Sequence, residues 1–172
     1  EKALSNSSDY DESIVHHVGL GKSASEIFEE LTIEDIGSVA DALIPVYQAT
    51  GRKDGFASLE VNPHLAHDTQ GTVSEAVRLF SALNRPNVMI KVPATPEGIP
   101  AISQLIGEGI NVNVTLIFSL KTYGHVRDAY LSGLETFSAI GGDVSKVSSV
   151  ASFFVSRVDT ALARGWSAPA PP

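Results

Sequence analysis

The middle of the chain reads Asn84-Arg85-Pro86-Asn87-Val88-Met89-Ile90-Lys91-Val92-Pro93-Ala94-Thr95. A polar turn that contains a proline leads into a short apolar run, and a helical pattern follows. An apolar run of this length, bounded by prolines, predicts a strand that is buried on both faces. Such strands are typical of parallel sheets covered by helices. The segment therefore predicts an α/β protein.

Lys91 interrupts the apolar run from Val88 to Val92. Burying an ammonium group is costly, because the charged form loses its hydration. A lysine avoids this cost when its long side chain reaches solvent or pairs with a carboxylate. A third explanation is functional, since a neutral amine in such a place can attack a carbonyl group. For an isolated lysine the first two explanations are favoured, so the ends of the other strands are decisive.

Composition limits the classes of protein that fit. The chain has 172 residues, of which 43% are hydrophobic and 19% charged, a balance typical of one domain with a core. A net charge of −8 opposes binding to nucleic acid or to an anionic membrane surface. The absence of cysteine excludes disulfides and thiolate metal sites. With no signal peptide or membrane span visible, we expect a cytoplasmic protein, and its oligomeric state stays open.

Strands and amphipathic helices alternate after a helical N-terminal region. Helices are expected at 10–18 and, after a capping box formed by Ser23 and Glu26, from residue 23, with a further start at 32. Strands are expected at 56–61, 88–93, 110–118 and 147–155, with helices at 72–83, 95–109, 119–140 and 158–163. This order predicts a parallel sheet covered on both sides. Four units do not close an eight-stranded barrel, so an open doubly wound sheet and part of a barrel both fit.

Polar side chains gather near the carboxyl ends of these strands, where parallel α/β folds place their reactive groups. They are Glu60, Lys91, Asn113, Thr115, Ser152 and, just beyond the last strand, Arg157. Together they suit carbonyl chemistry: the lysine forms an imine, and the carboxylate and hydroxyls move protons or hold a water molecule. The amide binds substrate hydroxyls, and the guanidinium suits a phosphate.

Each of these residues also has a purely structural explanation. Glu60 can pair with the lysine of the neighbouring strand, and Asn113 and Thr115 can be satisfied polar groups at a strand end. Ser152 can be a small packing residue, and Arg157 a solvated residue at a helix terminus. One active site accounts for all of them together better than separate coincidences do.

Four segments resemble the successive strand motifs of transaldolases, and the bacterial type, including forms fused to a glucose-phosphate isomerase, is the most similar. They are Ser58-Leu59-Glu60-Val61, Ile90-Lys91-Val92-Pro93-Ala94-Thr95, residues 111–119 and residues 151–159. The similarity extends from about residue 1 to about residue 163. It implies a partial (β/α)8 TIM barrel of about four central βα units, preceded by helices. We expect this domain at 1–165 and an Ala/Pro-rich tail at 166–172.

The resemblance also implies a role for each candidate residue. Lys91 stands where the family has its Schiff-base lysine, Glu60 and Thr115 match the residues that hold the catalytic water, and Asn113 matches a ligand of a substrate hydroxyl. Ser152 corresponds to a substrate contact and Arg157 to a phosphate ligand.

The implied reaction transfers a dihydroxyacetone unit between sugar phosphates in the pentose phosphate pathway. Sedoheptulose 7-phosphate or fructose 6-phosphate would be the donor, and glyceraldehyde 3-phosphate or erythrose 4-phosphate the acceptor. No metal or organic cofactor is implied, because the protonated imine accepts the electrons.

The sequence also departs from the family pattern. The chain begins at Glu1 without a methionine. The family's first strand, which supplies an acid–base aspartate, and its second strand, which supplies an asparagine, are not found in the sequence. The last two strands, with a further arginine, are not found either. We therefore expect a chain truncated at both ends.

Other functions stay open. A related fructose-6-phosphate aldolase shares the lysine strand, but the long helical region at 23–50 argues against it. A non-catalytic fragment that binds sugar phosphates would keep Ser152 and Arg157 without turnover. The spacing of His64, His67 and Asp68 would allow a metal site, but an exposed loop is the favoured interpretation.

Overall fold

Two helices precede the sheet in the computed structural model, which describes residues 8–166. They are α2 (Asp11–Gly19) and α3 (Ala24–Ala49). The predicted capping box is confirmed: the Ser23 hydroxyl accepts a hydrogen bond from the Glu26 amide, and the Glu26 carboxylate accepts one from the Ser23 amide. The further helix start expected at residue 32 is wrong. Thr32 donates to the carbonyl of Phe28 inside one continuous helix, which also contains Pro45.

Four strands then alternate with four helices, as the sequence predicts. The strands are β1 (Ala57–Glu60), β2 (Val88–Pro93), β3 (Val112–Ile117) and β4 (Ser149–Phe153). The helices are α4 (Thr69–Leu83), α5 (Gly98–Gly107), α6 (Leu120–Ala139) and α7 (Val155–Trp166), with short 3₁₀ turns η1 (Pro63–Leu65) and η2 (Val144–Lys146). Helix α7 reaches Trp166, and residues 167–172 of the expected tail lie outside the described part.

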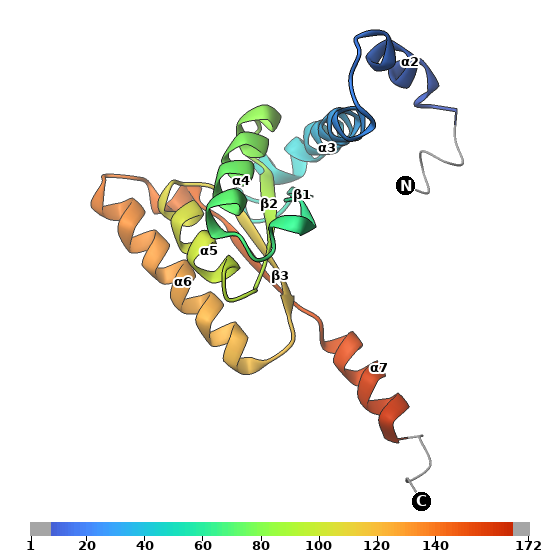
Figure 1. The fold of residues 1–172 in the computed structure, drawn as a ribbon. Helices are drawn as coiled ribbons and strands as arrows, with labels where there is room; N and C mark the ends of the chain where they lie inside the picture. Colours follow the sequence, from blue (N-terminus) through green and yellow to red (C-terminus); the bar gives the residue numbers. More distant parts are fainter. Residues whose placement is uncertain (1–7, 167–172) are drawn as a thin grey trace, which may run out of the picture.

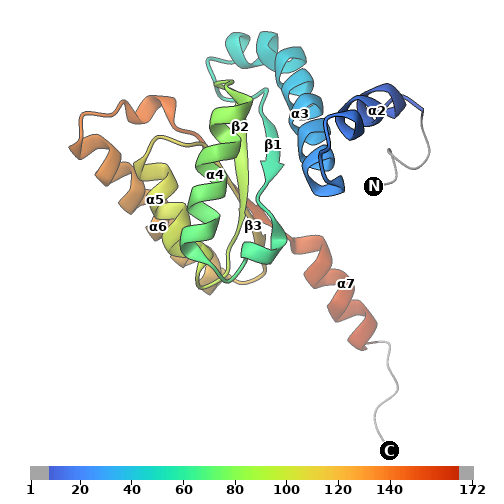
Figure 2. The ribbon, with the colours of Figure 1, turned by 45° about the horizontal axis from the view of Figure 1, so that its top comes forward.

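The strand order identifies the architecture. The four parallel strands are neighbours in the order β1-β2-β3-β4, with no reversal. Because βαβ crossovers are right-handed, an unreversed order places successive helices on the same face of the sheet. Figures 1 and 2 show α4, α5 and α6 together on one side. A doubly wound sheet needs a reversal of strand order, so this sheet is an arc of a (β/α)8 barrel.

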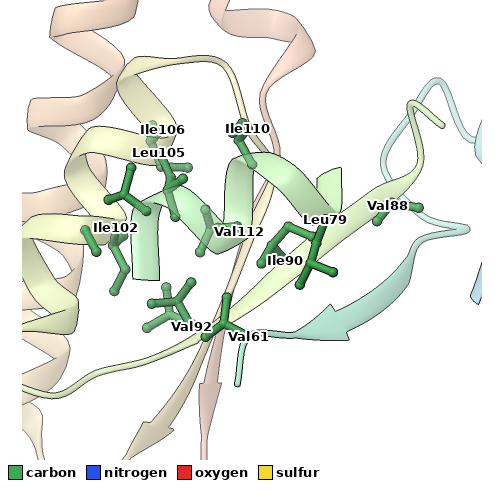
Figure 3. Close-up of a cluster of buried hydrophobic side chains, with 14 of the residues drawn as sticks. Val61, Leu79, Val88, Ile90, Val92, Ile102, Leu105, Ile106, Ile110 and Val112 are labelled. Carbon is green, nitrogen blue, oxygen red and sulfur yellow. The ribbon is translucent and has the colours of Figure 1, made fainter. Parts of the chain in front are cut away.

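The hydrophobic core lies between this sheet and its helices. Alternate residues of the strands are buried against α4 and α5. Figure 3 shows Val88, Ile90, Val92 and Val112 of the strands, Val61 directly after β1, and Leu79, Ile102, Leu105 and Ile106 of the two helices. Burying each such side chain stabilises the fold by roughly 1.5–3 kcal/mol. The other strand positions point to the opposite face.

The opposite face confirms one expectation and corrects another. Strand β2 is buried on both faces except at Lys91: Met89 and Pro93 share the face of Lys91 and are buried, whereas the Lys91 side chain is 33% exposed. On β4, Val150 is 44% exposed. The prediction of a sheet covered on both sides is therefore wrong for the described residues, and the polar strand-end residues occupy the face turned away from the helices.

A β-bulge distorts β3 close to these residues. Val114 pairs with Ala151 and Ile117 pairs with Phe153, so Thr115 and Leu116 together face Ser152. Leu116 has φ of 60°, in the left-handed region. The extra residue returns Ile117 to the core, where it is fully buried, although strict alternation would turn it to the polar face.

Among residues 8–166, none of the helices combines the length and the apolar character that crossing a bilayer requires.

Candidate active site

Three of the predicted residues form a row across the sheet. Glu60 of β1 is the register partner of Lys91 of β2, which in turn is the partner of Asn113 of β3. Register partners in a parallel sheet project to the same face, so the three side chains share the polar face. The row places a carboxylate, an amine and an amide on adjacent strands, as the sequence predicts.

The contact between Glu60 and Lys91 is loose. The Lys91 Nζ lies 3.4 Å from the Glu60 Oε2, and the two side chains keep 33% and 48% of their exposure. An ion pair that solvent reaches this well stabilises a fold by about 1 kcal/mol or less. The purely structural explanation therefore assigns little stability to the pair, and the amine is accessible from the polar face.

The Asn113 amide is held from two sides. Its Nδ2 donates to the Ser58 hydroxyl oxygen at 3.3 Å, and its Oδ1 accepts a hydrogen bond from the Ser152 hydroxyl at 2.8 Å. The structure thus joins Ser152 to the row, as expected. Sequence reasoning missed Ser58, although its place two residues before Glu60 puts it on the same face.

Thr115 lies one step further along the polar face, as the register partner of Pro93. Thr115 is only 3% exposed. Its Oγ1 atom is buried and has no hydrogen-bond partner among the residues that the structure describes. Buried hydroxyls are normally satisfied, and an unsatisfied one is expensive. Such a group at an active site is suited to bind a water molecule or a substrate oxygen.

Arg157 is placed apart from the row. It lies in the first turn of α7, and its guanidinium carbon is 4.2 Å from the centroid of the Phe154 ring. The ring of Phe154 lies next to that of Phe118, with centroids 5.6 Å apart. Figures 1 and 2 show α7 extending away from the sheet. Within the described residues, no hydrogen bond or ion pair connects Arg157 to Lys91.

Two open hollows lie near the amino-terminal side of the sheet. The larger, of about 740 Å³, is lined by Ser58, Met89 and Asn113 among others, and so reaches the edge of the row. The other, of about 650 Å³, is lined by residues such as Tyr47 and Asn111 and lies away from Lys91. Lys91 lines neither hollow, and it stands on the open face of the sheet.

The histidine spacing noted in the sequence serves other contacts. The Asp68 side chain accepts a hydrogen bond from the Gly71 amide and caps α4, and His67 Nδ1 lies 3.3 Å from Glu97 Oε2. Throughout the part of the chain that the structure describes, no three His, Cys, Asp or Glu residues are grouped to hold a metal ion.

Comparison with known proteins identifies the family. A model of the family described as "Transaldolase/Fructose-6-phosphate aldolase" matches residues 1–169. The chain belongs to this family. The match covers all four strands, so the resemblance of the chain to this family is confirmed.

Curated relatives of this family are similar over most of the chain. A protein named "Transaldolase" from Saccharopolyspora erythraea is 53% identical over 161 residues, which are 94% of this chain and 43% of the relative. "Transaldolase" from Trichodesmium erythraeum is 48% identical, and "Transaldolase 1" from Streptomyces avermitilis is 50% identical, with similar coverage. The chain therefore spans less than half the length of the relatives it matches.

Proposed function

We propose that the protein is a transaldolase-type enzyme, or the part of one, that forms a Schiff base through Lys91. The observation that carries this proposal is the position of Lys91 between a carboxylate and an amide, on the polar face of a barrel arc. The loose contact with Glu60 leaves the amine accessible to a carbonyl compound. Family membership and the relatives named transaldolase support the same reaction.

The proposed reaction begins at the carbonyl carbon of a ketose phosphate. The neutral Lys91 amine adds to C2, and an acid protonates the hydroxyl of the carbinolamine, which leaves as water to give a protonated imine. The C4 hydroxyl then loses its proton, the C3–C4 bond breaks, and its electron pair moves toward the iminium nitrogen as an enamine. The shorter aldose phosphate leaves as an aldehyde. The enamine attacks the aldehyde carbon of the acceptor, and water finally releases the new ketose.

The residues of the row and the other candidate residues each have a part in this scheme. Glu60 and the unsatisfied hydroxyl of Thr115 would hold the water that the imine steps release and consume. Asn113 and Ser152 would bind a substrate hydroxyl, and Arg157 a phosphate. The resemblance assigns the proton of the C4 hydroxyl to an aspartate on a strand that the 172 residues do not contain.

The proposed substrates are those of the pentose phosphate pathway. Fructose 6-phosphate and sedoheptulose 7-phosphate would donate the dihydroxyacetone unit, and erythrose 4-phosphate and glyceraldehyde 3-phosphate would accept it. Their phosphate groups match a positively charged ligand such as Arg157.

A transfer assay tests the proposal. The purified chain is incubated with fructose 6-phosphate and erythrose 4-phosphate, and sedoheptulose 7-phosphate and glyceraldehyde 3-phosphate are measured. We expect both products to form in equal amounts, and neither to form with Lys91→Arg, which keeps the charge but not an amine that forms imines.

The same assay separates the alternatives. Free dihydroxyacetone in place of the seven-carbon product would indicate fructose-6-phosphate aldolase activity. Saturable binding of fructose 6-phosphate without either product would identify a non-catalytic sugar-phosphate-binding chain, and the proposal of catalysis would be wrong.

A further inference from the structure

The Asn113 amide lies in a chain of hydrogen bonds that crosses the sheet from β1 to β4. Ser58 of β1 is two strands away from Asn113 of β3, and yet their side chains meet at 3.3 Å. In a (β/α)8 barrel the inward side chains of alternate strands form one layer. Ser58 and Asn113 therefore belong to the same layer of this arc, and the contact follows from its curvature.

The small size of Ser58 allows this contact. Its register partner on the intervening strand, Met89, is 3% exposed. Because a layer is formed by alternate strands, Met89 belongs to a neighbouring layer and does not separate Ser58 from Asn113. A side chain longer than that of serine or threonine at position 58 would occupy the path of the Asn113 side chain. Ser58 supplies a hydroxyl at the end of that path.

The two hydroxyls together restrain the amide. With only the bond from Ser152 to Oδ1, the Asn113 side chain could swing about that contact. The second bond, from Nδ2 to Ser58, fixes the plane of the amide. Each bond uses one hydrogen-bonding position, so one N–H and one lone pair of Asn113 stay available for a ligand.

We propose that Ser58 is a positioning residue, which holds the Asn113 amide in the orientation that binds a substrate hydroxyl beside Lys91. This inference rests on the proposed function, because it assigns to Asn113 a ligand of the ketose. Ser58 itself does not touch the reacting atoms. It acts through Asn113, whose orientation determines how tightly the ketose is held before the imine forms.

The test combines labelling with spectroscopy on the full chain. Fructose 6-phosphate is titrated in the presence of borohydride, and the labelled fraction of Lys91 is measured by mass spectrometry. We expect Ser58→Ala to raise the concentration for half-maximal labelling on the order of tenfold, with maximal labelling retained. Ser58→Thr keeps the hydroxyl and should restore the wild-type value.

Ser149→Ala is the matched control. Ser149 also donates from the sheet to β3, but to the backbone carbonyl of Val112 at 2.8 Å and not to Asn113. The control should leave half-maximal labelling unchanged. Equal shifts in Ser58→Ala and Ser149→Ala would mean that both hydroxyls only support the sheet, and would overturn the proposal.

A second measurement does not depend on catalysis. The side-chain amide signals of Asn113 in a ¹H–¹⁵N spectrum are assigned by their loss in Asn113→Asp. Ser58→Ala should shift them and Ser149→Ala should not. Unmoved signals would show that Ser58 does not hold Asn113. A wild-type chain that cannot be labelled would instead remove the proposed function, while the spectrum still reports on the contact.

Discussion

Thr115 combines burial with an unused hydroxyl. Because its Oγ1 has no hydrogen-bond partner within the described residues, replacing it by a methyl group removes a hydroxyl that bonds to no protein group. We expect Thr115→Val to keep the free energy of unfolding within about 0.5 kcal/mol of the wild-type value in urea denaturation. The same variant should slow imine formation, since a water molecule loses its partner.

Thr72→Val provides the comparison. Thr72 is equally buried, but its hydroxyl donates to the carbonyl of Leu65 at 2.9 Å. This variant should therefore lower the free energy of unfolding by about 1 kcal/mol. If Thr115→Val destabilised the fold as much as Thr72→Val, the hydroxyl of Thr115 would make a stabilising hydrogen bond within the protein, which would contradict its assignment to a water molecule.

At this scale, sequence reasoning was successful where strand periodicity determined the outcome. The sequence placed Glu60, Lys91 and Asn113 together near the carboxyl ends of their strands, and the structure aligns them in register, although Asn113 is the second residue of β3. Ser58 could not be found, since serine is common and the contact depends on barrel curvature across an intervening strand. Arg157 was expected at the site, and among the described residues it stacks on Phe154 without a hydrogen bond to Glu60, Asn113 or Ser152, so its role stays a prediction.

At the scale of elements, the bulge of β3 depends on the backbone of Leu116. A non-glycine residue with φ of 60° is strained, and a β-branched residue there is a stronger outlier. Asparagine tolerates this region better than other residues. We expect Leu116→Asn to be more stable than Leu116→Val by about 1 kcal/mol in urea denaturation, although valine is the more hydrophobic replacement.

A Leu116→Val variant more stable than Leu116→Asn would contradict the left-handed backbone conformation at the bulge. A regular strand prefers valine to asparagine, so a more stable Leu116→Val would mean that β3 has an ordinary extended backbone at this residue. The positions of Thr115 and Ile117 on opposite faces would then need another explanation.

Helices α3 and α4 are joined by a bidentate ion pair. Arg78 donates to both carboxylate oxygens of Glu29, at 2.6 and 2.7 Å, and these hydrogen bonds lower the pKa of Glu29 below its ordinary value of 4.5. The folded pKa is below the unfolded one, so the stabilisation is complete above pH 4.5 and is lost as the pH falls through the folded pKa. Glu29→Gln should cost roughly 0.5 kcal/mol at pH 7, because solvent screens the pair.

The measurement is the free energy of unfolding of wild type and Glu29→Gln as a function of pH. The difference between them should shrink as the pH falls below about 4.5. Glu34, an exposed glutamate of the same helix, gives the control variant Glu34→Gln, for which no such difference is expected. A difference that stayed constant down to pH 3 would exclude the ion pair as its cause.

Element boundaries were predicted where capping chemistry is local. The Ser23–Glu26 capping box is confirmed, and the helix expected from residue 119 begins at Leu120 after Ser119, whose hydroxyl accepts a hydrogen bond from the Thr122 amide. The start expected at residue 32 was wrong, because a threonine side chain can also donate to the preceding turn inside a helix. The bulge at Leu116 was not predicted, since leucine gives no signal of a positive φ.

At the scale of the whole molecule, the outer strands differ from the inner ones. Strands β2 and β3 pair on both sides, whereas β1 and β4 each pair on one side within the described residues. Backbone amides at an open sheet edge lack a protein acceptor and open to solvent more readily. We expect hydrogen exchange to be slower in β2 and β3 than in β1 and β4.

Uniform protection of all four strands would contradict this picture, because it would mean that both edges are covered in solution. The measurement is exchange at pH 7 followed by mass spectrometry, at two protein concentrations. Concentration-dependent protection of β1 and β4 alone would indicate that the edges pair between molecules.

The overall architecture was only partly predictable from strand and helix periodicity. The alternation gave a parallel α/β sheet but left a doubly wound sheet and a barrel both open, since periodicity does not report the order of strands. Strand order determines which face each helix covers, and the observed order leaves the polar face without a helix in residues 8–166. The four strand motifs resolved this choice by resemblance.

The central claim is that Lys91 is a nucleophile that forms an imine. The most direct test is incubation of the chain with fructose 6-phosphate and borohydride, followed by peptide mass spectrometry. We expect a stable mass adduct on Lys91 that is absent from Lys91→Ala. A folded sample that gives no adduct on Lys91, or an equal adduct on other lysines, would contradict the claim.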